Sequence, residues 1–427
     1  MSLLARLARD SLWLLLARLG AQGSLVIATS LLAQRLGTAG FGEYAFIAAA
    51  IVIGNTLTTF GSDMLLIREI AAKSEFNQLL DVLVLQLVLS GLFIGAVVAF
   101  ASNLPNQTPE SILALKIYSL ALIPLAFFTV FTSALRGAQK MTAYAWLNLA
   151  IPVLQVAAIT IFIQDRTNIV TLAYLLLIIQ IVGALLGGIF CFAVFPGFSK
   201  DWHFSWNKTF PLFVACLPIA LISILGIVYQ KLSLATLSLL GTASMVGIFS
   251  AAARVVEAAR IGHIAVFTAI YPAMANANQN QLSGGTFRLS WILLLLFSAV
   301  GSILLYGLAA PTVALLFGAA YALSTPVLQI LAFTLIPYTV NSFLSLLFLA
   351  RKQEKIVLQV LTISLLMLFA LNLWFVPRAG QVGASWAMLI AEVVQALLFL
   401  FVWMKSPLRQ MTAIPPKGVS YELSDLS

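Results

Sequence analysis

Long apolar runs, most of them about 20 residues or longer, follow one another along almost the whole chain and are separated by short polar segments. An α-helix needs about 20 apolar residues to cross the hydrocarbon core of a bilayer. The runs cover residues 11–35, 41–62, 78–101, 111–135, 142–163, 169–195, 210–240, 245–274, 287–310, 326–350, 356–376 and 382–404. The sequence therefore predicts an all-α integral membrane protein with about twelve transmembrane helices.

The composition leaves little room for a soluble domain. Only 9% of the residues are charged and the mean hydropathy is +1.05, whereas soluble domains carry about 25% charged residues. A net charge of +9 would point to nucleic acid in a soluble protein. Here it reflects basic loops, so we expect no nucleic-acid partner. Cys191 and Cys216 lie in or beside apolar runs, which predicts small buried residues and neither a disulfide, a metal site nor a cofactor.

The distribution of basic residues predicts the orientation. With a cytoplasmic N-terminus, fifteen of the 23 Lys and Arg residues lie on the cytoplasmic side and three lie outside, namely Arg35, Arg166 and Arg378. Short cytoplasmic loops are enriched in Lys and Arg. We therefore expect both termini in the cytoplasm. The segments predicted outside are 102–110, 164–168, 241–244, 311–324 and 377–381.

A weak internal repeat divides the chain into two halves. The segment Gly37–Ala39 aligns with Gly241–Ala243, and with one residue of slip Gly42 aligns with Gly247. Six runs separate the two copies, an even number, so the repeats should be parallel and related by an axis along the membrane normal. We expect a six-helix lobe at 1–199, a second at 200–405, and a cytoplasmic tail at 406–427.

Charged residues within the runs are the candidate functional groups. Arg254, Glu257 and Arg260 follow one another at three-residue steps, so Glu257 can pair with either arginine. Charges inside transmembrane helices usually face the bundle interior or a water-filled cavity. Further polar candidates are Arg18 and Gln22 in the first run, Lys231 in the seventh, and Glu392 in the last. The alternative is that Arg254, Glu257 and Arg260 form a structural ion network.

The chain lacks the motifs that would indicate an enzyme. It contains no HExxH, GxSxG, phosphate-binding loop or CxxC pair. A membrane polymerase, ligase or glycosyltransferase should offer a long extramembrane loop with paired carboxylates, and every loop here is short. We therefore expect a transporter or flippase and not an enzyme.

Five segments resemble the motifs of one transporter family, in the same order. They are LGTAGFGEYAF (36–46), IREIA (67–71), VGIFSAAARVVE (246–257), LLFGAAY (315–321) and VPRAGQVGASWA (376–387). The chain resembles the Wzx-type polysaccharide flippases of the multidrug/oligosaccharidyl-lipid/polysaccharide exporter superfamily. One departure is Ser233, which stands where many relatives have an acidic residue.

This resemblance implies a fold and a function. The fold is a V-shaped bundle of two six-helix lobes around a central cavity. The function is transfer of an undecaprenyl-pyrophosphate-linked oligosaccharide, a repeat unit of O-antigen, capsule or exopolysaccharide, from the inner to the outer leaflet of the bacterial cytoplasmic membrane. The partners would be this polyprenyl-pyrophosphate-linked oligosaccharide, membrane lipids and a polysaccharide polymerase.

The charged residues suit such a substrate. A pyrophosphate is anionic, and arginine can donate two parallel hydrogen bonds to it. The candidate substrate-binding residues are Arg18, Gln22, Lys231, Arg254, Glu257 and Arg260, and the candidate ion-coupling residues are Glu257 and Glu392. Two alternatives with similar folds remain open: a lipid II or teichoic-precursor flippase, and a cation-coupled multidrug antiporter of the same superfamily.

Overall fold

The structure, a computed structural model, describes residues 3–73, 76, 78–164, 167–195, 206–260 and 284–405, with side chains omitted for 3–16, 18, 73, 206–210 and 284–290. The described secondary structure is helical throughout, as the apolar runs predicted. The helices are α1 (Leu3–Thr59), α2 (Ser62–Lys73), α3 (Leu79–Phe100), η1 (Ala101–Asn103), α4 (Pro109–Ser119), α5 (Leu122–Gly137), α6 (Met141–Phe162), α7 (Ile169–Val194), α8 (Trp206–Leu240), α9 (Ala243–Ala259), α11 (Gly284–Gly307), α12 (Ala309–Phe317), η2 (Ala319–Tyr321), α13 (Ser324–Ala332), α14 (Leu335–Ala350) and α15 (Glu354–Lys405).

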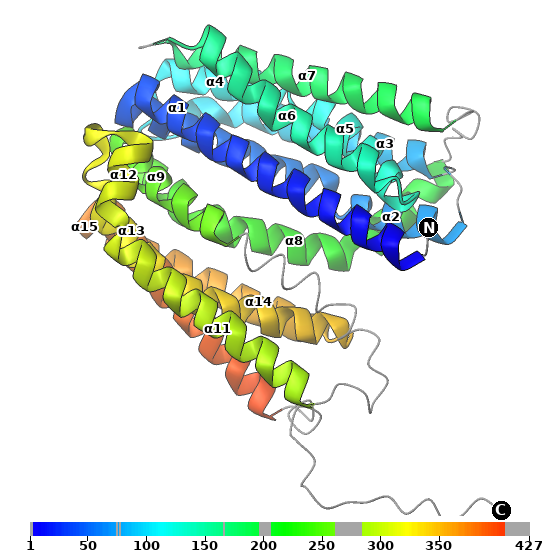
Figure 1. The fold of residues 1–427 in the computed structure, drawn as a ribbon. Helices are drawn as coiled ribbons and strands as arrows, with labels where there is room; N and C mark the ends of the chain where they lie inside the picture. The colour runs from blue at the N-terminus through cyan, green and yellow to red at the C-terminus, as the bar shows by residue number, and fades with distance from the viewer. Residues whose placement is uncertain are drawn as a thin grey trace, which may run out of the picture.

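Seven helices in the described part of the chain are long and apolar enough to cross a membrane, or nine if the bent pairs α11–α12 and α13–α14 each count as one span. Two of these helices, α1 and α15, contain a break at a glycine. Gly37 has φ 66° and Gly380 has φ 54°, values that favour glycine because it has no β-carbon. Figure 1 shows α2 lying near the N-terminus, so the chain has returned from the far end of α1. Each of these helices therefore contains two of the predicted spans.

The helices form two lobes, α1–α7 and α8–α15, that lie together at one end, and α11, α14 and α15 diverge from the first lobe toward the other end (Figure 1). The beginning of α8 stays against the first lobe, where the rings of Phe213 and Phe60 stack with their centroids 4.6 Å apart. This confirms the predicted fold class of two helical lobes. We call the end where they meet the closed end; it is formed by residues 33–42, 104–108, 238–247 and 316–321. The predicted lobe boundary at residues 199–200 and the tail at 406–427 lie outside the described residues.

Hydrogen bonds between the lobes concentrate at the closed end. The side chains of Thr38 and Ser244, one from each copy of the repeat, contact each other with 2.9 Å between their hydroxyl oxygens. Other side chains donate to backbone carbonyls of the opposite lobe: Tyr321 to Ala33 (3.0 Å), Gln34 to Leu316 (2.8 Å), Asn106 to Leu239 (2.7 Å), Gln107 to Ser238 (3.0 Å) and Ser30 to Leu316. The two motif copies identified in the sequence therefore lie against each other.

Two glycines allow the lobes to approach this closely. A β-carbon built on Gly42 would lie 1.7 Å from the carbonyl oxygen of Ala243, and one built on Gly247 would lie 2.0 Å from that of Thr38. Neither position can hold a β-carbon without moving the backbone of the opposite helix. Small residues at helix crossings in membranes allow such backbone contact. The aligned pair Gly42 and Gly247 is therefore the crossing point of α1 and α9.

Part of the segment predicted as a loop at 311–324 is helical. It contains most of α12 and all of η2, and Gly318 joins them with φ 84°. The ring of Tyr321 is buried and its hydroxyl reaches the backbone of α1. The polar end of the tyrosine gives this segment an anchor in the opposite lobe. Alternation of apolar and small residues alone did not reveal that contact, because its partner lies almost 300 positions away.

Candidate functional site

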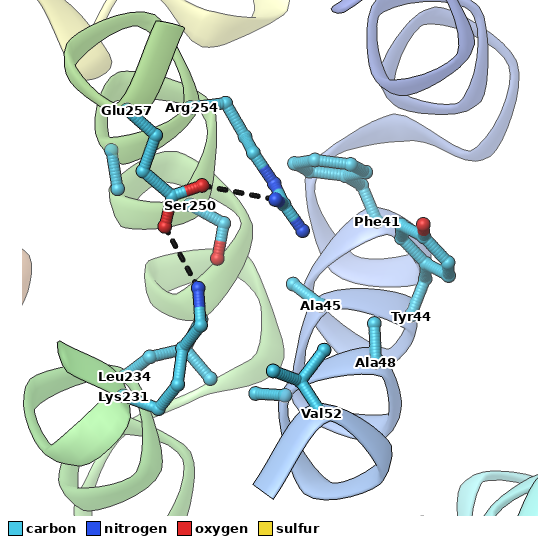
Figure 2. Close-up of a pocket in the computed structure, with 12 residues that line it drawn as sticks. Phe41, Tyr44, Ala45, Ala48, Val52, Lys231, Leu234, Ser250, Arg254 and Glu257 are labelled. Atoms are coloured by element: carbon cyan, nitrogen blue, oxygen red, sulfur yellow. Dashed lines mark hydrogen bonds and ion pairs between the residues drawn. The ribbon is translucent and has the colours of Figure 1, made fainter. Parts of the chain in front are cut away.

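A cluster of three charged side chains, Lys231, Arg254 and Glu257, lies between α8, α9 and the second half of α1. Glu257 of α9 accepts from two cations, with Lys231 Nζ at 2.8 Å and Arg254 Nη1 at 3.0 Å from its two carboxylate oxygens. Figure 2 shows the carboxylate between the ammonium group below it and the guanidinium group beside it. Two positive charges share one negative charge, so the cluster carries a net charge of +1.

Helix geometry explains how the cluster assembles. Arg254 and Glu257 are three residues apart and therefore neighbours on one face of α9. Lys231 enters from α8, which packs beside α9. The second half of α1 faces them with the small side chains of Ala45 and Ala48, which are flanked by Phe41, Tyr44 and Val52.

The pocket around the cluster is narrow. The residues that line it are Phe41, Tyr44, Ala45, Ala48, Ala49, Val52, Lys231, Leu234, Ser250, Ala253, Arg254 and Glu257. Its water-accessible space is about 20 Å³, enough for about one water molecule. The side chains of Lys231, Arg254 and Glu257 retain 12%, 25% and 36% of their exposure. In this conformation both cations are paired with Glu257. A phosphate would have to displace the Glu257 carboxylate or bind the cations beside it.

Arg260 lines a second small pocket together with Lys231 and Glu257, but its own bonds run to other residues. Its Nη2 lies 3.6 Å from Glu392 of α15 and 3.2 Å from the hydroxyl of Thr334. The guanidinium also lies over the ring of Tyr338, 4.1 Å from the ring centroid. A step of six residues from Arg254 turns a side chain about 120° around the helix. Arg260 therefore points into the second lobe. Its spacing in the sequence allowed a pair with Glu257, but the structure pairs it with Glu392.

The Arg260–Glu392 pair is almost fully enclosed, with side-chain exposures of 9% and 4%. Asn341 of α14 donates to the other Glu392 oxygen at 2.7 Å. Ser233 accepts a hydrogen bond from Asn372 at 3.1 Å in the same lobe. Hydrogen bonds compensate a buried ion pair for lost hydration. The structural-network interpretation of the sequence thus fits Arg260 better than Arg254.

The remaining predicted residues lie elsewhere. Gln22 is exposed on the first half of α1, whereas the cluster faces the second half. The side chain of Arg18 lies outside the described residues. Sequence reasoning named Lys231 but did not pair it with Glu257.

Nine of the twelve residues that line the pocket were not predicted as site residues, among them Phe41, Tyr44 and Ser250. All three belong to the motif segments 36–46 and 246–257. Their position in the two copies of the internal repeat was the available signal.

The sequence model of a family described as "Polysaccharide biosynthesis protein" matches residues 7–278. A comparison with curated proteins gave no match.

Several solved structures share the fold. An inward-facing multidrug resistance MATE transporter of the MOP superfamily superposes with a TM-score of 0.72 and 18% identity, covering 92% of this chain and 96% of its own. The lipid II flippase MurJ in an inward closed conformation gives 0.72 and 16%, covering 93% and 88%. A MOP superfamily transporter from Pyrococcus furiosus gives 0.68 and 16%, covering 95% of each chain.

The family match covers more than half of the chain, and the solved transporters extend the fold match to nearly all of it. Both agree with the two-lobed membrane bundle and with the resemblance found in the sequence. The chain therefore belongs to the polysaccharide biosynthesis protein family and has the fold of the MOP superfamily of transporters.

Proposed function

We propose that this protein is a flippase that moves an undecaprenyl-pyrophosphate-linked oligosaccharide repeat unit from the inner to the outer leaflet of the bacterial cytoplasmic membrane. The observation that carries the proposal is the cluster of Lys231, Arg254 and Glu257 between the lobes. Lys231 lies nine residues before the end of α8, about 14 Å along the helix, and the hydrocarbon core is about 30 Å thick. A net positive charge at this depth suits an anionic head group in transit.

Glu257 gives the cluster two states. With the carboxylate ionised, it neutralises part of the charge of Lys231 and Arg254. If a proton or a coupling ion binds the Glu257 carboxylate, Lys231 and Arg254 both become available to a pyrophosphate. Glu392 is the second proposed coupling residue, and its ionisation state would act on Arg260 and Asn341 within the second lobe. Arg18, Gln22 and Arg260 remain proposed contacts for the substrate in other conformations.

The two alternative functions differ in the charge that the pocket should carry. A cation-coupled multidrug antiporter needs a pocket that attracts organic cations, through carboxylates or aromatic faces. The pocket here contains Phe41 and Tyr44, but its charged groups sum to +1. A lipid II or teichoic-precursor flippase would need the same positive charge. The charge of the pocket therefore argues against the antiporter.

The test is the fate of the lipid-linked repeat unit in cells that lack this protein. We expect repeat units to accumulate on the cytoplasmic leaflet, where an impermeant glycosidase cannot reach them in intact cells. The wild-type gene should restore their access to the enzyme, and an unrelated flippase gene serves as the control. Unchanged surface polysaccharide together with an unchanged pool of lipid-linked repeat units would contradict the proposal.

The proposed orientation has a separate test. Single cysteines at residues 106, 242 and 379 should react with an impermeant maleimide added to intact cells, because the Lys and Arg distribution places these segments outside. Cysteines at 138 and 353 should react only after the cells are opened. Labelling in the reverse pattern would invert the proposed topology.

A further inference from the structure

A second pocket lies beside the charged one, and its lining is apolar. It lies between the second half of α1, the end of α3 and the end of α8, and its volume is about 360 Å³. Phe46 and Ala50 of α1 face Phe93 and Val97 of α3 across it. The ring of Phe93 can lie close to α1 because a β-carbon on Gly54 would come within 2.7 Å of it.

The two pockets share a wall. Ala49 of α1 and Leu234 of α8 line both of them. Leu234 lies three residues after Lys231, one turn farther along the same helix. Within a single turn, α8 therefore contributes a cation to the charged pocket and an apolar side chain to the second pocket. A ligand that fills both pockets needs an anionic group attached directly to a hydrocarbon chain.

The apolar pocket opens at the surface of the molecule. Phe100, which lines it, keeps 69% of its surface exposed. Phe100 belongs to a helix that is long and apolar enough to cross a membrane, so its exposed face can contact acyl chains. A chain held in this pocket can therefore extend into the bilayer without crossing water.

The depth of the charged pocket distinguishes two sources of such a chain. Phospholipid head groups lie at the membrane surface, while Lys231 is about 14 Å along α8 from its end. A resident phospholipid would leave its head group far from the cations. A polyprenyl pyrophosphate that is being transported must bring its anionic group to this depth.

We infer that the apolar pocket of α1, α3 and α8 binds the isoprenoid chain of the polyprenyl-linked substrate next to its pyrophosphate. This inference rests on the proposed function and adds a second binding site to it. The chain leaves the protein along the seam of α1, α3 and α8 and stays in the membrane while the head group occupies the cluster.

Two alanines on α3 provide a matched pair of variants. Ala96 lines the pocket and Ala99 does not, and both are exposed on the same helix. Ala96→Trp should fill the pocket, whereas Ala99→Trp adds the same side chain toward lipid. Excluding only two CH₂ groups of the chain should weaken binding roughly tenfold.

The experiment uses the purified full chain in lipid nanodiscs and three probes. An undecaprenyl phosphate that carries a photoreactive group in its first isoprene units should label α1, α3 and α8. Labelling should fall roughly tenfold in Ala96→Trp and stay at the wild-type level in Ala99→Trp. A short dimethylallyl pyrophosphate, which reports on the charged cluster alone, should bind both variants equally. Phosphatidylglycerol with a photoreactive acyl chain should label the pocket weakly.

Each result separates the two proposals. Equal labelling of Ala96→Trp and Ala99→Trp by the polyprenyl probe would overturn the isoprenoid site and leave the charged cluster untouched. Strong labelling by phosphatidylglycerol would assign the pocket to a structural lipid and overturn it as well. If dimethylallyl pyrophosphate fails to bind the wild-type protein while the polyprenyl probe labels the pocket, the isoprenoid site stands and the role of the cluster is wrong.

Discussion

Replacing Gly42 with alanine should separate the lobes at the closed end and abolish transport. The added methyl group would lie 1.7 Å from the carbonyl oxygen of Ala243 and 2.9 Å from the backbone nitrogen of Gly247. Both atoms belong to the backbone of the second lobe, so a side-chain rotation cannot relieve the overlap. Alanine favours a helix over glycine by about 1 kcal/mol, so α1 itself should not be weakened.

The measurement is cross-linking across the closed end. Cysteines in place of Thr38 and Ser244, whose hydroxyl oxygens are 2.9 Å apart, should form a disulfide in a chain with Cys191 and Cys216 replaced. Gly42→Ala should reduce the cross-linked fraction severely. Gly23→Ala is the control on the same helix, because a β-carbon there meets nothing within 4 Å. Normal cross-linking and normal export by Gly42→Ala would show that the glycine crossing is not required.

The sequence predicted the elements of this closed end better than their contacts. Apolar run lengths predicted the spans, and the repeat paired Gly42 with Gly247. Helix crossings depend on which faces meet, and a weak repeat does not contain that information. The positive φ at Gly37 and Gly380 also breaks the helical course within α1 and α15, a local feature that glycine permits without requiring.

The candidate site shows the same division. The i, i+3 spacing of Arg254 and Glu257 made their pairing predictable, and the pair is present. The choice between Arg254 and Arg260 depended on Glu392, which lies more than 130 residues later and competes for Arg260. The distance from Lys231 to Glu257 likewise depends on how α8 packs beside α9. Long-range pairs of this kind require the fold.

Replacing Arg254 with glutamate should abolish transport. The substitution changes the charge of the cluster from +1 to −1, because Lys231 would then face two carboxylates. Two unit charges 4 Å apart interact by about 4 kcal/mol at an effective dielectric constant of 20. The cluster would then repel a pyrophosphate by an energy of the order by which it attracted it before. A change of this size is more than enough to prevent binding.

The loss should follow from charge and not from misfolding. Lys231 stays next to both carboxylates in this variant and offsets part of their repulsion, so the variant should reach the membrane at normal abundance. Arg378→Glu makes the same chemical change on α15, where the guanidinium lies over Trp374, 3.7 Å from the ring centroid, and outside the charged cluster. It should export polysaccharide normally. Export is measured as surface polysaccharide per molecule of protein in the membrane.

Two further substitutions separate binding from structural support. Arg254→Lys keeps the charge but loses the planar fork, so transport should fall without vanishing.

Glu257→Gln removes the carboxylate that holds Lys231 and Arg254 and raises the net charge of the cluster to +2. If the cluster binds the substrate, this variant should be normally abundant and should release the repeat unit slowly, with altered transport. If the cluster only holds α8 against α9, Glu257→Gln should instead lose abundance and transport together. Normal export by Arg254→Glu at normal abundance would rule out the cationic cluster as the site that carries the head group.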